Sequence, residues 1–390
     1  MTLLLLIIYL AFISLGLPDS VLGAAWPAMR PDFDAPLDTA GYLFMVIACG
    51  TIVSSLASGK LLKHFGVGKV SLVSAAMTAA ALLGFHFAPS LLWLVLCAIP
   101  LGLGAGAIDA GLNDFVARHY KAHHMSWLHS FWGVGATSGP IVMAFFIDTQ
   151  DSWRNGYLAI AIIQFSLVII YSLSLPLWKK VENTQKRTIV AETNTDESVK
   201  QPKSKPLQTK GVKFALLSLF FYCSAEAAVG LWGSSYLVNV KDVSPSVAAK
   251  WISFYWAGIT IGRFITGFVT LKIDNNHLIR SGQITALSGA ILLLLPLPIP
   301  FALAGLLLIG LGLAPIFPCM LHETPTRFGT THSQSIMGYQ MATAYTGTTF
   351  IPPLLGFIAT QTSIAIFPMF LVLIIALMLI ASERLLYVLK

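Results

Sequence analysis

The chain has 390 residues, of which 56% are hydrophobic and 11% are charged. A soluble protein carries roughly 25% charged residues, so this composition excludes a soluble globule and indicates a polytopic membrane protein. The formal net charge of +7 does not indicate nucleic-acid binding, because most of the basic residues lie in loops between apolar runs.

The apolar runs are about 20 residues long or longer and lack the alternation of membrane strands, so they predict helices that cross a bilayer. We predict an all-α integral membrane protein with twelve spans. Their expected bounds are 3–26, 39–60, 70–88, 91–116, 125–147, 156–178, 214–238, 248–271, 278–296, 299–320, 333–358 and 362–382. Basic residues concentrate in alternate loops, and the positive-inside rule then places both termini in the cytoplasm. We expect the chain to reside in the plasma membrane of the cell.

Residues 179–213 are the only long polar segment, and we expect them to form a flexible cytoplasmic linker. The linker separates a bundle of six helices at 1–178 from a second one at 214–390. Several glycines recur at a constant offset of 208 positions, among them Gly102 with Gly310. This repetition predicts two pseudo-symmetric halves with a substrate site between them at the middle of the membrane.

An acidic residue interrupts the fourth predicted span, in the stretch from Gly102 to Phe115. A carboxylate inside such a span costs about 3 kcal/mol on insertion scales, so it marks a functional position. Asp109 and Asn113 are four residues apart and share one helix face. We predict that this face lines a polar pathway; the alternative is a buried pair that bonds one helix to another.

Two further acids occupy nearly the same place in the two halves. Asp19 follows Gly16 and Pro18, where the first helix should be kinked, and under the offset of 208 it falls next to Glu226 of span seven. A carboxyl group at low dielectric can load and release a proton near neutral pH. Asp19, Asp109 and Glu226 are therefore candidates for proton coupling; structural hydrogen bonding is the alternative for Asp19 and Glu226.

Other polar and aromatic side chains in the spans suit a polyhydroxylated ring, which has an apolar face and a rim of hydroxyl groups. His129 of span five could bind substrate or exchange a proton with Asp109, or could simply be satisfied by a neighbour. Trp232 and Gln340 are candidates from the second half, with packing as the alternative.

Charged residues near the cytoplasmic ends of the spans are candidates for gating. Asp114 and Arg118 form an i,i+4 pair at the end of span four, with Lys63 expected nearby. Arg263 of span eight could gate or could snorkel to the membrane surface.

Motifs for catalysis and cofactor binding are incomplete in this sequence. The glycines from Gly102 to Gly106 follow no strand, and His322-Glu323 lacks the second histidine of a zinc motif. The four cysteines lie in apolar spans without ligand spacing. We therefore expect no catalytic residue, no metal and no cofactor; the coupling ion should be H+, with Na+ as the alternative.

The stretch from Gly59 to Lys69 resembles the loop 2–3 motif of the major facilitator superfamily, with Lys63 and His64 where that family has an acid and an arginine. The residues from Asp109 to Val116, Phe221 to Glu226 and Gly312 to Pro318 resemble the fucose permease and glucose permease group of sugar–proton symporters. This resemblance implies that Asp19 and Asp109 act in sugar recognition and proton coupling.

The sequence thus predicts a monomeric secondary transporter that works by alternating access in the lipid bilayer and carries a hexose or related small polar solute with protons. Two alternatives remain at this stage. A proton-driven efflux carrier for drugs or lipids would need a mainly apolar cavity, and a non-transporting sensor would need a sizeable domain outside the membrane. Neither an enzyme nor a nucleic-acid binder is expected.

Overall fold

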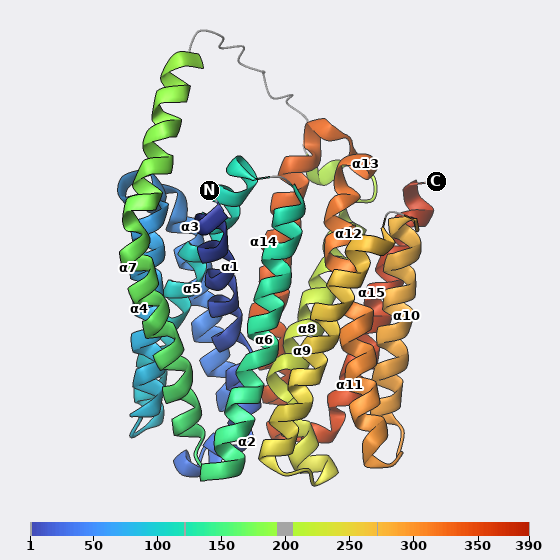
Figure 1. Cartoon of the computed structure of the whole chain (residues 1–390). Helices are drawn as coiled ribbons and strands as arrows, with labels where there is room; N and C mark the ends of the chain where they lie inside the picture. The colour runs from blue at the N-terminus through green and yellow to red at the C-terminus, as the bar shows by residue number, and fades with distance from the viewer. Residues whose placement is uncertain (1, 121, 193–205, 271, 390) are drawn as a thin grey trace.

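The computed structural model describes residues 2–120, 122–192, 206–270 and 272–389. These residues form helices and connecting turns, without a strand in the ranges given. The long helices run nearly parallel to one direction (Figure 1). The helices are α1 (Thr2–Asp19), α2 (Val21–Met29), α3 (Thr39–Phe65), α4 (Val67–His86), α5 (Leu91–His119), α6 (Ala122–Gln150), α7 (Trp153–Glu192), α8 (Val212–Lys241), α9 (Pro245–Val269), α10 (Asn275–Leu294), α11 (Ile299–Leu313), α12 (Ile316–His322), α13 (Thr324–Phe328), α14 (Thr330–Gln361) and α15 (Phe367–Leu389).

In the described part of the chain, eleven stretches are long and apolar enough to cross a membrane. Helices α1 and α2 together make the first of them, and α11 with α12 make another. The remaining expected span corresponds to α14, which runs alongside the others (Figure 1) but is rich in threonine, glycine and tyrosine. The all-α membrane fold is confirmed, and the polarity of α14 fits a helix that faces another protein surface rather than lipid.

The first span breaks where the sequence predicts, because α1 ends at Asp19 and α2 begins at Val21. Pro18 has no N–H and cannot bond the carbonyl of Ser14 one turn earlier. Gln164 of α7 supplies the missing donor, since its Nε2 donates to the Ser14 carbonyl oxygen over 2.6 Å. The break therefore leaves Asp19 at the free end of a helix, in the middle of a span.

Helix packing in the first half is repeated in the second. The pairs α1 with α6, α3 with α5 and α4 with α7 correspond to α8 with α14, α9 with α11 and α10 with α15. Gly102 lies against the carbonyl oxygen of Ile47, and Gly310 lies against that of Tyr255, which is the residue 208 positions after Ile47. The repeated glycines therefore serve one purpose, the close approach of two helix backbones.

The expected linker differs from the structure at its start, because α7 continues to Glu192 rather than ending near 178. Lysine, glutamate, glutamine and arginine are good helix formers, and extending an existing helix needs no new nucleus. Residues 193–205 lie outside the described ranges. We call the side where α7 ends and α8 begins the linker side; both termini lie on it (Figure 1).

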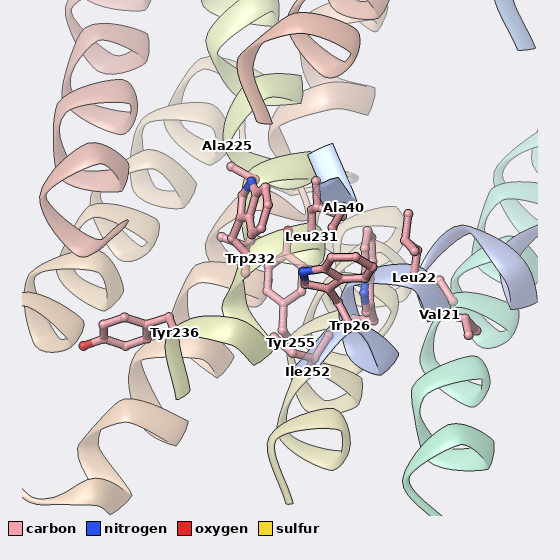
Figure 2. Close-up of a cluster of buried hydrophobic side chains, with 14 of the residues drawn as sticks. Val21, Leu22, Trp26, Ala40, Ala225, Leu231, Trp232, Tyr236, Ile252 and Tyr255 are labelled. Carbon is pink, nitrogen blue, oxygen red and sulfur yellow. The ribbon is translucent and has the colours of Figure 1, made fainter. Parts of the chain in front are cut away.

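On the side opposite the linker, the two halves are sealed by apolar packing. Leu22 and Trp26 of α2 lie in one buried cluster with Leu231 and Trp232 of α8 (Figure 2). A Cβ on Gly23 would collide with the carbonyl oxygen of Gly230. The backbones of α2 and α8 are therefore in contact, and the halves are closed here.

On the linker side, three glycines near the ends of α3, α9 and α14 have free space around them. A Cβ placed on Gly59, Gly267 or Gly338 would meet no described atom within 4 Å. Contacts between α3 and α14 are instead found at the far side, where the backbone N–H of Asp38 donates to Thr360. The structure is thus packed tightly on one side of the membrane and loosely on the other.

Candidate functional site

The first element of the site is Asp19 with its indole partner. A Cβ on Gly16 would collide with the carbonyl oxygen of Trp132, so α1 and α6 touch at this point. The Nε1 of Trp132 donates a hydrogen bond of 2.9 Å to Oδ2 of Asp19. Asp19 remains solvent-accessible although it lies in the middle of a predicted span. Its described partner is neutral, so its charge is not compensated by this contact.

The second element is Asp109 on α5. Nδ2 of Asn113 donates to Oδ1 of Asp109 and to its carbonyl oxygen, each over 3.0 Å. Asp109 interacts electrostatically with Asp19 and with Tyr345 of α14. The acids of α1 and α5 therefore share one site, and the second half reaches it through Tyr345.

The third element is an ion pair in the second half. Nη2 of Arg263 lies 2.9 Å from Oε1 of Glu226, and the two side chains are only 14% and 17% exposed. The Tyr222 hydroxyl donates to the same carboxylate oxygen over 3.0 Å, and Arg263 also donates to that hydroxyl. Arg263 therefore neither snorkels to the surface nor stands free at a gate in this structure; it compensates the charge of Glu226.

His129 and Trp132 of α6 approach the second half near the linker-side end of their span. His129 is solvent-accessible, lies edge-on to Phe12 at 5.9 Å between ring centroids and interacts electrostatically with Arg263. The guanidinium carbon of Arg263 lies 5.7 Å from the ring centroid of Trp132. The positions of His129, Trp132 and Arg263 define a central site that both halves line.

Two predicted binding residues lie away from this site. Trp232 is fully buried, and its Nε1 donates to the carbonyl oxygen of Pro352 over 2.7 Å. Gln340 is also fully buried, and its Oε1 accepts a hydrogen bond from Thr324 near the linker side. Both make packing contacts in this conformation, and we leave them out of the proposed binding site.

The predicted gate of Lys63, Asp114 and Arg118 stays a prediction. Lys63 is exposed, and the side chains of Asp114 and Arg118 are not among those that the structure describes. The second half, however, holds charge pairs at the linker side that the sequence analysis missed. Arg280 makes two bonds to the Glu383 carboxylate, and Arg327 lies 4.0 Å from Glu323. Only Arg327 and Glu323 have the i,i+4 spacing that could have predicted a pair.

Residues important to the site were also missed. None of Trp132, Tyr222 and Tyr345 was among the site residues that the sequence predicts. Tyr222 lies one helical turn before Glu226, and that spacing could have suggested their hydrogen bond. The contacts of Trp132 with Asp19 and Arg263 span 113 and 131 sequence positions, so no local sequence pattern predicts them.

A helical membrane fold with two repeated halves and a polar site between them defines a secondary transporter. The family model of the Major Facilitator Superfamily matches residues 8–346. The chain therefore belongs to the Major Facilitator Superfamily, a family of transporters and not of enzymes.

Individual relatives are more distant. The chain is 25% identical to the glucose/mannose transporter GlcP of Bacillus subtilis over 328 residues, which cover 80% of this chain and 77% of GlcP. It is 28% identical to Bypass of stop codon protein 6 of Saccharomyces cerevisiae over 68% of this chain, but the match spans only 56% of the yeast protein.

Solved structures show the same fold at low identity. A D-xylose-proton symporter superimposes with a TM-score of 0.76 at 13% identity, covering 99% of this chain and 97% of the other. A bacterial homologue of the human lysosomal transporter Spinster, in an inward-facing and unoccupied conformation, gives a TM-score of 0.73 at 13% identity, with coverage of 99% and 98%.

Proposed function

We propose that this protein is a proton-coupled symporter for a hexose or related sugar. The observation that carries the proposal is the pair of carboxyl groups on Asp19 and Asp109, which interact with each other and have neutral hydrogen-bond donors. Two carboxylates in one site repel one another when both are ionised, so proton binding relieves that repulsion. The glucose and mannose specificity in the name of GlcP supports a sugar as the cargo.

The second half supplies a different electrostatic environment. Glu226 is compensated by Arg263 at 2.9 Å, so we assign it to a fixed ion pair rather than to proton transfer. A site with two neutralised acids and one closed ion pair carries no net charge. Such a site suits an uncharged, hydroxyl-rich solute, for which Asn113, His129 and Tyr345 are the candidate polar and aromatic contacts.

Alternating access is proposed from the difference between the two sides of the membrane. Gly41 of α3 packs against Pro353 of α14. Following the antiparallel register of this contact toward the linker side brings Gly59 to within about one helical turn of the level of Gly338, and both have free space. We propose that this end closes by packing these glycines when the opposite seal opens. With the termini in the cytoplasm of the cell, as the loop charges suggest, the described conformation would face inward.

The proposed function is tested by uptake of radiolabelled sugars into proteoliposomes, with and without an inward acid pH gradient. Wild-type protein should accumulate at least one hexose only when the gradient is present. Asp109→Asn should lose this accumulation while it still exchanges sugar across the membrane at equal pH.

A matched variant controls for loss of a hydrogen bond in the same site. Asn113→Ser removes the amide that donates to Asp109 but keeps the Asp109 carboxyl group; because Asn113 is also a candidate sugar contact, its KM for sugar should rise while its uptake still depends on the pH gradient. If wild-type protein moves no sugar under either a proton or a sodium gradient, the symporter proposal fails. Proton-driven export of an apolar compound would then favour the efflux carrier.

A further inference from the structure

Trp132 is the one described side chain that contacts both the acid of α1 and the cation of α9. Its indole N–H donates to Asp19 over 2.9 Å, and its ring face lies 5.7 Å from the guanidinium carbon of Arg263. Its ring also meets Trp256 of α9 edge-on, with the ring centroids 5.6 Å apart. Asp19 belongs to the first half, whereas Arg263 and Trp256 belong to the second. The indole therefore spans the boundary between the halves.

The position of this indole is fixed by the backbone beneath it. A Cβ on Gly16 would collide with the Trp132 carbonyl oxygen, and one on Gly135 would collide with that of Ile13. Helices α1 and α6 thus pack without intervening side chains and hold Asp19 and Trp132 in register. Because α1 and α6 cannot shift against each other, a change in the hydrogen bond between these two residues alters the electron distribution or orientation of the indole.

The protonation state of Asp19 changes the strength of the attraction between the indole ring of Trp132 and the guanidinium of Arg263. An ionised carboxylate accepts the N–H in a charge-assisted hydrogen bond, which is stronger than a bond to a neutral acid. Hydrogen bonds in series polarise one another, and a stronger N–H bond leaves more electron density on the ring. A more negative ring face attracts a guanidinium more strongly. Protonation of Asp19 reverses each of these changes.

We propose that Trp132 couples the protonation of Asp19 to the position of the second half through Arg263. This inference rests on the proposed proton coupling. It adds the route by which protonation of Asp19 affects the interface between α6 and α9. Ionised Asp19 strengthens the contact between the halves at Trp132 and Arg263, and protonated Asp19 loosens it. Trp132 is thereby a positioning residue that acts through Arg263.

Other titratable and charged groups surround Asp19, Trp132 and Arg263 and contribute to any pH response of the interface. They are Asp109 of α5, His129 of α6, Tyr222, Cys223 and Glu226 of α8, Tyr255 and Arg263 of α9, and Tyr345 of α14. Variants of Trp132 and Asp19 leave all of these in place. A response that disappears in those variants therefore belongs to the Asp19–Trp132 contact.

The test measures closure of the linker side without using a sugar. Cysteines are introduced as Gly59→Cys and Gly338→Cys in a chain whose four native cysteines are replaced, since both positions have room for a side chain. The rate of cross-linking by a short bifunctional thiol reagent is normalised to single-cysteine controls. In the otherwise wild-type chain, we expect this rate to change about twofold between acid and alkaline buffer, because only roughly 10–30% of the attraction between the ring and Arg263 changes with the hydrogen bond.

Trp132→Phe keeps an aromatic ring but removes the N–H, and Asp19→Asn removes the titrating group. Both should give a cross-linking rate that depends less on pH than the wild-type rate does, and what remains belongs to the surrounding groups. Trp256→Phe is the matched control, because the Trp256 N–H is buried without a described partner. It should keep the wild-type pH dependence.

Two results separate this inference from the proposed function. If the wild-type rate does not respond to pH, proton coupling itself fails and the inference fails with it. If the wild type responds and Trp132→Phe responds equally, the inference alone is overturned. Equal loss of the response in Trp256→Phe would also overturn it, because packing would then explain the effect.

Discussion

Two acids at nearly equivalent places in the two halves have opposite surroundings. Asp19 lies at the end of α1 and receives a neutral N–H from Trp132, whereas Glu226 of α8 receives both the charge of Arg263 and the Tyr222 hydroxyl. The position 208 residues before Arg263 is Ser55, so the first half has no cation at the equivalent place. The comparison teaches that a repeated backbone can hold a free acid in one half and a fixed ion pair in the other.

The largest expected effect comes from breaking the fixed pair. Glu226→Gln leaves Arg263 buried without a counter-charge, and such a loss typically costs about 3–5 kcal/mol of stability. The variant should unfold at a much lower temperature in detergent. The double variant Glu226→Gln/Arg263→Gln removes both charges and should recover most of the loss. If it is no more stable than the single variant, the two charges do not compensate one another.

A smaller effect is expected at the seal that determines which side reaches the acids. Gly23→Ala places a methyl group against the Gly230 carbonyl oxygen and should weaken the closed seal by about 1–3 kcal/mol. Labelling of a cysteine introduced at Ser234, which donates to the Ala24 carbonyl in the seal, should become faster from the side opposite the linker.

The control for the seal is Gly267→Ala, where an added Cβ meets no described atom within 4 Å. It should leave the labelling rate at Ser234→Cys unchanged. Equal labelling in the Gly23 and Gly267 variants would show that the contact between α2 and α8 does not limit opening.

The two acids of the first half, which no cation compensates in the described structure, should govern accumulation of the sugar. With a gradient of one pH unit, symport of one proton supports about tenfold accumulation of a neutral sugar. Asp109→Asn should reduce this ratio to about one while leaving equilibrium exchange intact. Both quantities are measured in the same vesicles: the accumulation ratio from uptake of labelled sugar under the pH gradient, and the exchange rate from replacement of labelled by unlabelled sugar at equal pH. Persistence of tenfold accumulation would remove Asp109 from the coupling path.

The smallest expected effect is a loss of stability at Trp232, which lies in a packed region, in contrast to Trp132, which lies in the site. Trp232→Phe loses the hydrogen bond to Pro352 in a packed region, so stability should fall by about 1 kcal/mol while the KM for sugar stays constant. Trp132→Phe lies in the central site and should instead alter the pH dependence of transport. A raised KM with unchanged stability in Trp232→Phe would return Trp232 to the binding site.

Much of the fold follows from the sequence because its signals are local. The apolar lengths predict the spans, Pro18 predicts the break before α2, and glycines such as Gly102 and Gly310 predict close helix crossings. The continuation of α7 to Glu192 was missed because a polar composition resembles a linker even when its residues are good helix formers.

The site was less predictable because its pairings are long-range. The sequence singled out Asp19, Asp109, Glu226 and Arg263 as costly residues inside a membrane. It could not show that Arg263 pairs with Glu226, 37 positions away, rather than with an acid of the first half. Trp232 was predicted as a binding residue because of its residue type. In the structure its N–H donates to the carbonyl oxygen of Pro352 in α14 and is not available to a substrate.

The most direct test of the contrast between the two halves is infrared difference spectroscopy of the protein in bilayers between acid and neutral pH, which detects the carboxyl groups that gain a proton. The wild-type signal should shrink in Asp19→Asn and in Asp109→Asn, and it should persist in Glu226→Gln/Arg263→Gln. Loss of the signal in the double variant, with retention in both aspartate variants, would place the proton on Glu226 and contradict the account.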